Sequence, residues 1–99
     1  MSDREIDIGV IEECVENLHG VFDSTDLDVE FLKIRQKVDE ARYNPGDVKP
    51  LADCMLSLLL AARSSGYRAG AVLEELERVA RKNKDREWRK MPDGTYQSI

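Results

Sequence analysis

Apolar residues recur at helical spacing in four segments of this chain. In residues 4–22 and 27–41 they repeat every three or four positions and form one apolar stripe per segment. Residues 51–65 are apolar nearly all round, and a further apolar face runs from Ala69 to Ala80. No stretch alternates long enough to indicate a strand. The pattern therefore predicts an all-α fold, an antiparallel bundle of four helices.

Capping and turn residues separate these segments. Asp3 suits the N-cap of the first helix, and Thr25 with Asp28 three residues later resembles a capping box for the second. The turn at residues 44–47, Asn-Pro-Gly-Asp, ends the second helix, and its Asp47 can cap the third. Gly66 suits the residue after a helix C-terminus. These loops are short enough to place successive helices antiparallel.

The chain of 99 residues is long enough for one small domain. We expect residues 1–90 to form a single helical domain and residues 91–99 an extended C-terminal tail. The third helix should be the central buried one, or should face another copy in a homo-oligomer, a dimer or higher. The longest apolar run, residues 56–62, is too short to span a membrane, so no membrane association is expected.

Charge is distributed unevenly along the chain. The net charge of −5 makes nucleic-acid binding an unfavoured interpretation. Residues 1–30 hold ten acids and one base, which makes the first helix a candidate surface for a protein partner. Residues 78–90 hold seven bases and indicate a local anion site. Cys14 and Cys54 fall on apolar faces, which favours free buried thiols. With no signal-peptide pattern at the N-terminus, we expect a cytoplasmic protein.

Four pieces of sequence carry a resemblance to a known family. They are IR..VDEA (34–41), NPGD (44–47), AD..LSLLLAARSSGY (52–67) and RKNKDREW (81–88). In these pieces the chain resembles the MazG-like all-α nucleoside triphosphate pyrophosphohydrolases, and most closely their short dATP/dGTP-type members from bacteria and phages. The resemblance covers roughly the last two-thirds of the chain. It implies a MazG-like four-helix bundle that pairs with further copies.

The resemblance also implies a place for a metal ion. Family members share E-x-x-E on one helix and E-x-x-D on the next, often followed by another Asp, and these acids hold the Mg²⁺ that activates water on a triphosphate. The products are a nucleoside monophosphate and pyrophosphate. In this chain the five matching positions are Lys37, Glu40, Pro50, Asp53 and Leu60. Only Glu40 and Asp53 are therefore left as metal-binding candidates.

Lys37 changes the chemistry expected at these positions. An ammonium group can neutralise two carboxylates, but it cannot polarise water or bridge phosphates as Mg²⁺ does. At an effective dielectric constant near 20, a unit charge about 4 Å away is worth about 4 kcal/mol, so Lys37 also repels a divalent cation. Glu40 and Asp53 are thus either a structural salt bridge with Lys37 or Arg35, which we favour, or a residual metal pair. Efficient Mg²⁺-dependent hydrolysis is not expected.

The basic segment after residue 80 best retains the family pattern. The resemblance implies that Lys82, Asn83 and Arg86 contact the phosphates of a nucleotide, with Lys37 as an added positive contact. Trp88 could stack on a base, although a lone Trp more often anchors a core or an interface. The alternative interpretation of the basic residues is a solvated cationic helix end.

The sequence leaves three candidate functions. The first is a degenerate MazG-like protein, a pseudoenzyme that binds a nucleotide or phosphate ligand without efficient hydrolysis and sequesters or senses it. The second is an active nucleoside triphosphate pyrophosphohydrolase with a reduced set of ligands, in which Glu40 and Asp53 hold one Mg²⁺ alone or with acids from a second subunit. Glu12, Glu13 and Glu16 of the first helix offer replacement ligands. The third is a protein-interaction module that acts through that acidic helix.

Overall fold

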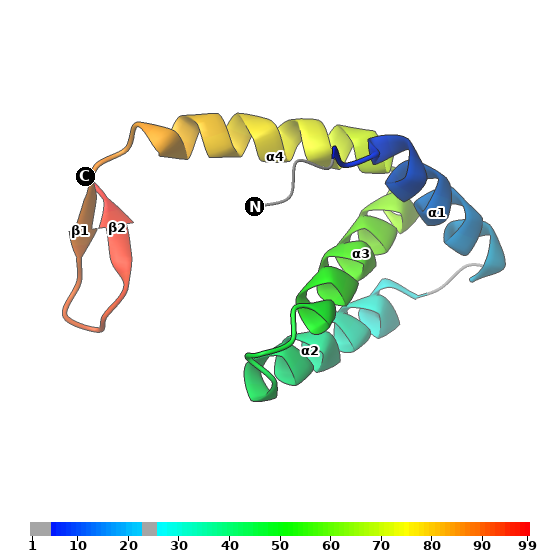
Figure 1. The fold of residues 1–99 in the computed structure, drawn as a ribbon, viewed down its shortest axis with the longest axis horizontal. Coiled ribbons are helices and arrows are strands. Elements are labelled where there is room, and N and C mark those ends of the chain that lie inside the picture. The colour runs from blue at the N-terminus through cyan, green and yellow to red at the C-terminus, as the bar shows by residue number, and fades with distance from the viewer. Residues whose placement is uncertain (1–4, 23–25) are drawn as a thin grey trace.

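Four helices and a short hairpin make up the fold. The computed structural model describes residues 5–22 and 26–99. Figure 1 shows the elements in chain order. They are α1 (Ile8–Val21), α2 (Leu27–Tyr43), α3 (Lys49–Ser64), α4 (Ala69–Lys84), β1 (Trp88–Lys90) and β2 (Tyr96–Ser98). The all-α class predicted from the sequence is confirmed, with a two-stranded sheet added at the C-terminal end.

Aspartate side chains begin the first two helices. The carboxylate of Asp7 accepts a hydrogen bond of 2.9 Å from the N–H two residues later, and α1 therefore begins at Ile8, later than expected. Asp26 caps α2 in the same way, also at 2.9 Å. The caps expected at Asp3 and Thr25 lie outside the described residues.

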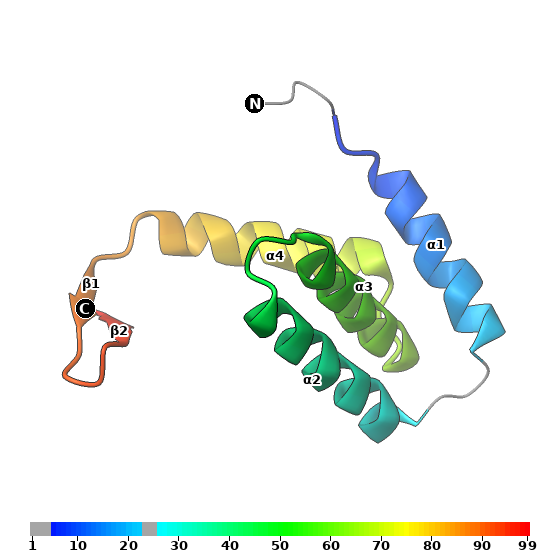
Figure 2. The ribbon, with the colours of Figure 1, turned by 60° about the horizontal axis from the view of Figure 1, so that its bottom comes forward.

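Helix α3 lies at the centre of the fold. It contacts α1, α2 and α4, and α2 runs antiparallel beside it (Figure 2). In the described part of the chain α2 packs on no helix other than α3. The core is correspondingly small. Its main cluster joins buried residues from α1, α3 and α4, namely Val15, Leu59, Leu60 and Ala69, with Ile11, Leu18, Leu56 and Val72 packed against them. Ile34 of α2 and Ala61 of α3 are also buried.

An ion pair adds to the apolar contact between α1 and α3. The Nε atom of Arg63 lies 2.9 Å from Oε2 and 3.1 Å from Oε1 of Glu16. Both side chains are partly buried, so water screens this pair less than a pair on the open surface. The guanidinium of Arg63, by its hydrogen bond, holds the pKa of Glu16 below its ordinary value. The pair thus fixes the position of α1 on the central helix.

Helix α4 extends away from the core, as Figure 1 shows, and carries the hairpin at its end. Its first residue, Ala69, is buried, whereas the second half of the helix is largely exposed. The preceding turn needs Gly66, whose φ of 97° is the left-handed conformation expected there.

Residues 88–98 form a hairpin where an extended tail was expected. Trp88 pairs with Ser98 and Lys90 with Tyr96. Gly94 turns the chain with a φ of 88°, and Asp93 accepts hydrogen bonds from the N–H and hydroxyl of Thr95. The expected boundary at residues 90 and 91 thus falls inside this hairpin. Strands of three residues are too short to show an alternating pattern in a sequence.

One expectation about α3 is wrong in part. The helix is central, but it is not buried all round, because Leu51, Met55 and Leu58 are exposed. Met55 lines an open apolar groove together with Val10, Ile11 and Cys14 of α1 and Leu73 of α4, so this side of α3 is only partly covered.

Candidate functional site

Lys37 lies between the two acids that the sequence singled out. Its Nζ atom is 3.7 Å from Oε2 of Glu40 and 4.0 Å from Oδ2 of Asp53. Glu40 is on the same helix, α2, three residues later, and Asp53 reaches the ammonium from α3. The structural salt bridge with Lys37 that the sequence favoured is therefore present. In the described residues Arg35 makes no ion pair with either acid.

A second lysine, which the sequence analysis missed, completes the site. The Nζ atom of Lys49 lies 2.9 Å from Oδ2 of Asp53, one helical turn along α3. The hydrogen bond from Lys49 is the main reason why the pKa of Asp53 lies below its ordinary value, and the Lys37 charge adds to it. The same bond raises the pKa of Lys49. The available signal was the spacing of four residues between Lys49 and Asp53.

This arrangement does not fit Mg²⁺. A divalent ion of this kind takes six oxygen ligands in a nearly octahedral shell. Here two ammonium groups surround one aspartate and one glutamate. Within residues 5–22 and 26–99, no three side chains of His, Cys, Asp or Glu lie close enough together to hold a metal ion. Instead, Lys37 and Lys49 form ion pairs with the two carboxylates, those of Glu40 and Asp53.

The acids of α1 do not supply the missing ligands within one chain. Glu16 is bound to Arg63, and Glu12 lies beside Gly70 at the start of α4. Helix α1 packs on α3 and α4, and within the described residues it has no contact with α2. Glu12, Glu13 and Glu16 are therefore not brought to the α2 side of α3, where Lys37 and Glu40 lie.

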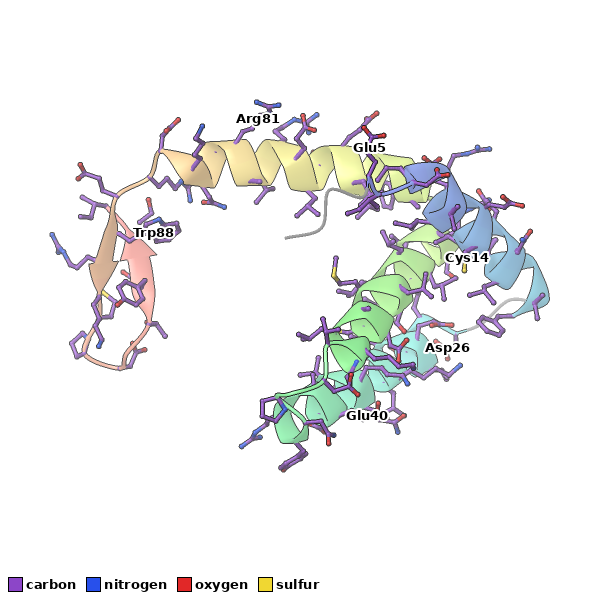
Figure 3. All side chains as sticks on the ribbon, viewed as in Figure 1. Glu5, Cys14, Asp26, Glu40, Arg81 and Trp88 are labelled. Carbon is purple, nitrogen blue, oxygen red and sulfur yellow. The ribbon has the colours of Figure 1, made fainter. Side chains whose placement is uncertain are left out.

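The basic residues expected to bind phosphate lie elsewhere in the molecule. Lys82 and Asn83 occupy the last turn of α4, and Arg86 follows the helix. Figure 3 shows Glu40 and Trp88 in separate parts of the molecule, the first on α2 and the second on the hairpin. In the described part of the chain α2 and α4 do not touch. Within one copy of the chain, Lys37 therefore lies apart from Lys82, Asn83 and Arg86.

Trp88 is available at the surface. It lies on β1 with 47% of its area exposed. Along β1, Lys90 lies two residues later on the same face of the strand as Trp88, whereas Arg89 points to the opposite face.

Glu30 is a buried acid that the sequence did not single out. It is 4% exposed and lies in the first turn of α2. It shares a helix face with the buried Ile34 four residues later, and that face packs against α3. An acid in this turn is favoured by the helix dipole. Its burial follows from the packing of α2, which the spacing of polar residues does not reveal.

Comparisons of the chain with protein-family models, curated proteins and solved structures give no match.

Cys14 and Cys54 are free thiols, both partly buried. Among the helices of the described residues, none has the length and apolar character needed to cross a membrane.

Proposed function

We propose that this protein binds a nucleotide or a related phosphate compound and does not hydrolyse it with Mg²⁺. Such a protein sequesters or senses its ligand. One observation carries the non-hydrolytic part of the proposal: the ammonium of Lys37 lies within 4.0 Å of both Glu40 and Asp53, where the resemblance to MazG-like enzymes implies a metal ion. A cation held there opposes the entry of a second, divalent cation.

The basic end of α4 supports the binding part of the proposal. In the described residues Lys82, Lys84 and Arg86 take part in no ion pair, whereas Arg78 and Arg81 on the same helix bind Glu75 and Glu77. Donors without a carboxylate partner are available to phosphate oxygens, which accept charge-assisted hydrogen bonds. Asn83 adds an amide donor in the same turn.

Binding is tested by titration calorimetry with dATP, dGTP and inorganic pyrophosphate, each with EDTA and with Mg²⁺. We expect binding in EDTA, and we expect Arg86→Ala to weaken it about tenfold, the loss of one charge-assisted hydrogen bond of about 1.5 kcal/mol. Arg78→Ala is the matched control, because it removes the same charge from a residue that is already paired with Glu75. Equal affinities for both variants would remove the basic end of α4 from the site.

Hydrolysis is tested separately by measuring pyrophosphate release from each dNTP with Mg²⁺. We expect no steady turnover by the purified protein. Sustained turnover would favour the active pyrophosphohydrolase, with acids from a second subunit as further ligands. Turnover that Lys37→Met increases would identify the ammonium as an inhibitory group.

A protein-interaction module is a second candidate, and the surface of α1 favours it. Ile8 and Val10 are exposed on this helix beside its acidic residues. Ile8 and Glu12 also line a groove of about 430 Å³ that α1 shares with α4. A partner for this surface would present apolar side chains and bases. Failure of every nucleotide and of pyrophosphate to bind would leave this candidate in place of the first.

A further inference from the structure

Both faces of the C-terminal hairpin are open to solvent. Every residue of β1 and β2 is exposed. In the described part of the chain neither strand packs against a helix, and the hairpin lies beyond the end of α4 in both ribbon views (Figure 1, Figure 2). Two strands of this length bury no core of their own. The side chains of the hairpin are therefore available to a ligand.

The register of the hairpin decides which residues share a face. Alternate residues of a strand point to the same side. One side, which we call the aromatic face, carries Trp88, Lys90, Tyr96 and Ser98. Met91 and Ile99, at the alternate positions, donate hydrogen bonds across the ladder at 2.6 and 3.0 Å. The residues of the aromatic face thus form the pairs without hydrogen bonds, whose side chains lie closest across the two strands.

Trp88 and Tyr96 are diagonal neighbours on the aromatic face. Trp88 stands directly across from Ser98, and Tyr96 is two residues nearer the turn. Such neighbours lie about 7–8 Å apart, within reach of aromatic side chains. Ser98 is too small to cover the indole, and Trp88 and Tyr96 remain 47% and 60% exposed. Two bases of an unstacked strand can each meet one of these rings.

The charge of this end of the chain differs from that of the rest. Residues 82–99 hold five bases and three acids, whereas residues 1–81 hold ten bases and seventeen acids. Lys90 stands on the aromatic face itself, directly across from Tyr96. Among the residues that the structure describes, Lys90 takes part in no ion pair. The net negative charge of the whole chain therefore does not apply to this face, where a phosphate backbone would meet a free cation.

We propose that the aromatic face of the hairpin binds single-stranded nucleic acid, with bases stacked on Trp88 and Tyr96 and a phosphate on Lys90. A ring stacks on any base, and a single strand exposes its bases whereas a duplex does not. The aliphatic residues Met91 and Ile99 fall on the opposite face, so neither face is the apolar surface that a membrane requires. The inference goes beyond the binding of a single nucleotide and does not depend on it, since it rests on the hairpin and not on the basic end of α4.

The first test uses Trp88, which is the only tryptophan of the chain, so that its fluorescence reports on this face alone. We expect a short oligo(dT) or oligo(rU) to quench this fluorescence at low salt by stacking on the indole. A DNA duplex of the same length and inorganic polyphosphate should not, because they offer charge without free bases. No quenching by either strand, or equal quenching by polyphosphate, would overturn the proposal. Quenching by anionic lipid vesicles but by neither strand would also overturn it and assign the face to a membrane surface.

The second test separates stacking from charge by titrating variants with labelled oligo(dT). Tyr96→Ala should weaken binding about tenfold because one stacked base is lost, whereas Tyr96→Phe keeps a ring and should bind as the wild type does. Tyr43→Ala is the matched control, since it removes an exposed tyrosine from α2 and should leave the affinity unchanged. Lys90→Gln should reduce the slope of log affinity against log salt by about 0.7, the share of one phosphate. Equal affinities for Tyr96→Ala and Tyr43→Ala, or a large loss in Tyr96→Phe, would overturn the stacking.

These results are distinguishable from those that test the binding of a single nucleotide. Quenching by oligo(dT) in a protein that binds neither dATP nor pyrophosphate would support the present inference and contradict the proposed function. Binding of dATP without quenching by either strand would do the reverse.

Discussion

The Nζ atom of Lys37 lies 4.0 Å from Oδ2 of Asp53, across the contact between α2 and α3. Asp53 therefore holds two cations, because Lys49 donates a direct hydrogen bond to the same oxygen at 2.9 Å. The two lysines reach it differently, one from the neighbouring helix and one from the preceding turn of its own helix. Their separate contributions can be measured.

Removing either lysine should raise the pKa of Asp53 toward its ordinary value of 3.8. Lys49→Ala should raise it more than Lys37→Met, since the hydrogen bond from Lys49 is the largest cause of the lowered value. The measurement is the carboxyl carbon chemical shift of Asp53 followed by NMR across the acid range. A larger rise in the Lys37 variant would show that Lys37 is the principal partner in solution.

Reversing the charge at the site should create metal affinity. Lys37→Glu with Lys49→Ala and Pro50→Glu replaces both ammonium groups and restores acids beside Asp53. We expect Mg²⁺ or Mn²⁺ affinity to rise more than tenfold, because each removed cation is worth up to about 4 kcal/mol at this range. Calorimetric metal titration gives the result, with Lys37→Met as the variant that removes charge without adding ligands. No gain in the triple variant would mean that the family's metal geometry does not apply to this chain.

The pair of Glu16 and Arg63 should make the attachment of α1 sensitive to acid. Because the pKa of Glu16 is lower in the folded protein than its ordinary value of 4.5, the pair stabilises the fold fully above that value. The contribution is lost as the pH falls through the folded-state pKa. Glu16→Gln should therefore lower the free energy of unfolding at neutral pH and reduce its dependence on pH in the acid range. Urea unfolding between about pH 3 and pH 6 measures this. Glu13→Gln, which removes an acid with no ion-pair partner in the described residues, should retain the wild-type dependence.

Substitution by alanine should have opposite effects on the stability of the fold at two glycines. Gly66 has a φ of 97°, so Gly66→Ala should destabilise the protein by about 1–2 kcal/mol. Gly20 lies inside α1 with open space around its Cα, so Gly20→Ala should stabilise it by about 0.5–1 kcal/mol. Thermal unfolding followed by circular dichroism compares them. A neutral Gly66→Ala would indicate that the turn between α3 and α4 adopts another conformation.

The positions of the helices could be predicted from the sequence because helices are local. The spacing of apolar residues located all four, and Gly66 and Asp47 marked their ends for reasons that involve only neighbouring residues. Asp47 accepts a hydrogen bond of 3.0 Å from the N–H of Lys49, although the N-cap position of α3 is the next residue, Val48. The hairpin at residues 88–98 was missed because its strands are too short for a periodic signal, and its turn depends on Gly94 and Asp93.

The site formed by Lys37, Glu40, Lys49 and Asp53 was predictable in part. The resemblance to MazG-like enzymes marked Lys37, Glu40 and Asp53 as parts of one site, and the short turn at residues 44–47 brings them together by folding α2 back on α3. The angle at which α4 leaves the core was not predictable, since it depends on packing around the buried Ala69 rather than on the pattern of α4 itself. The sequence by itself determined where helices form and that a lysine opposes the two acids. Only the tertiary structure decided that the basic end of α4 lies apart from that lysine and that one side of α3 stays open, because these relations arise from contacts between residues far apart in the chain.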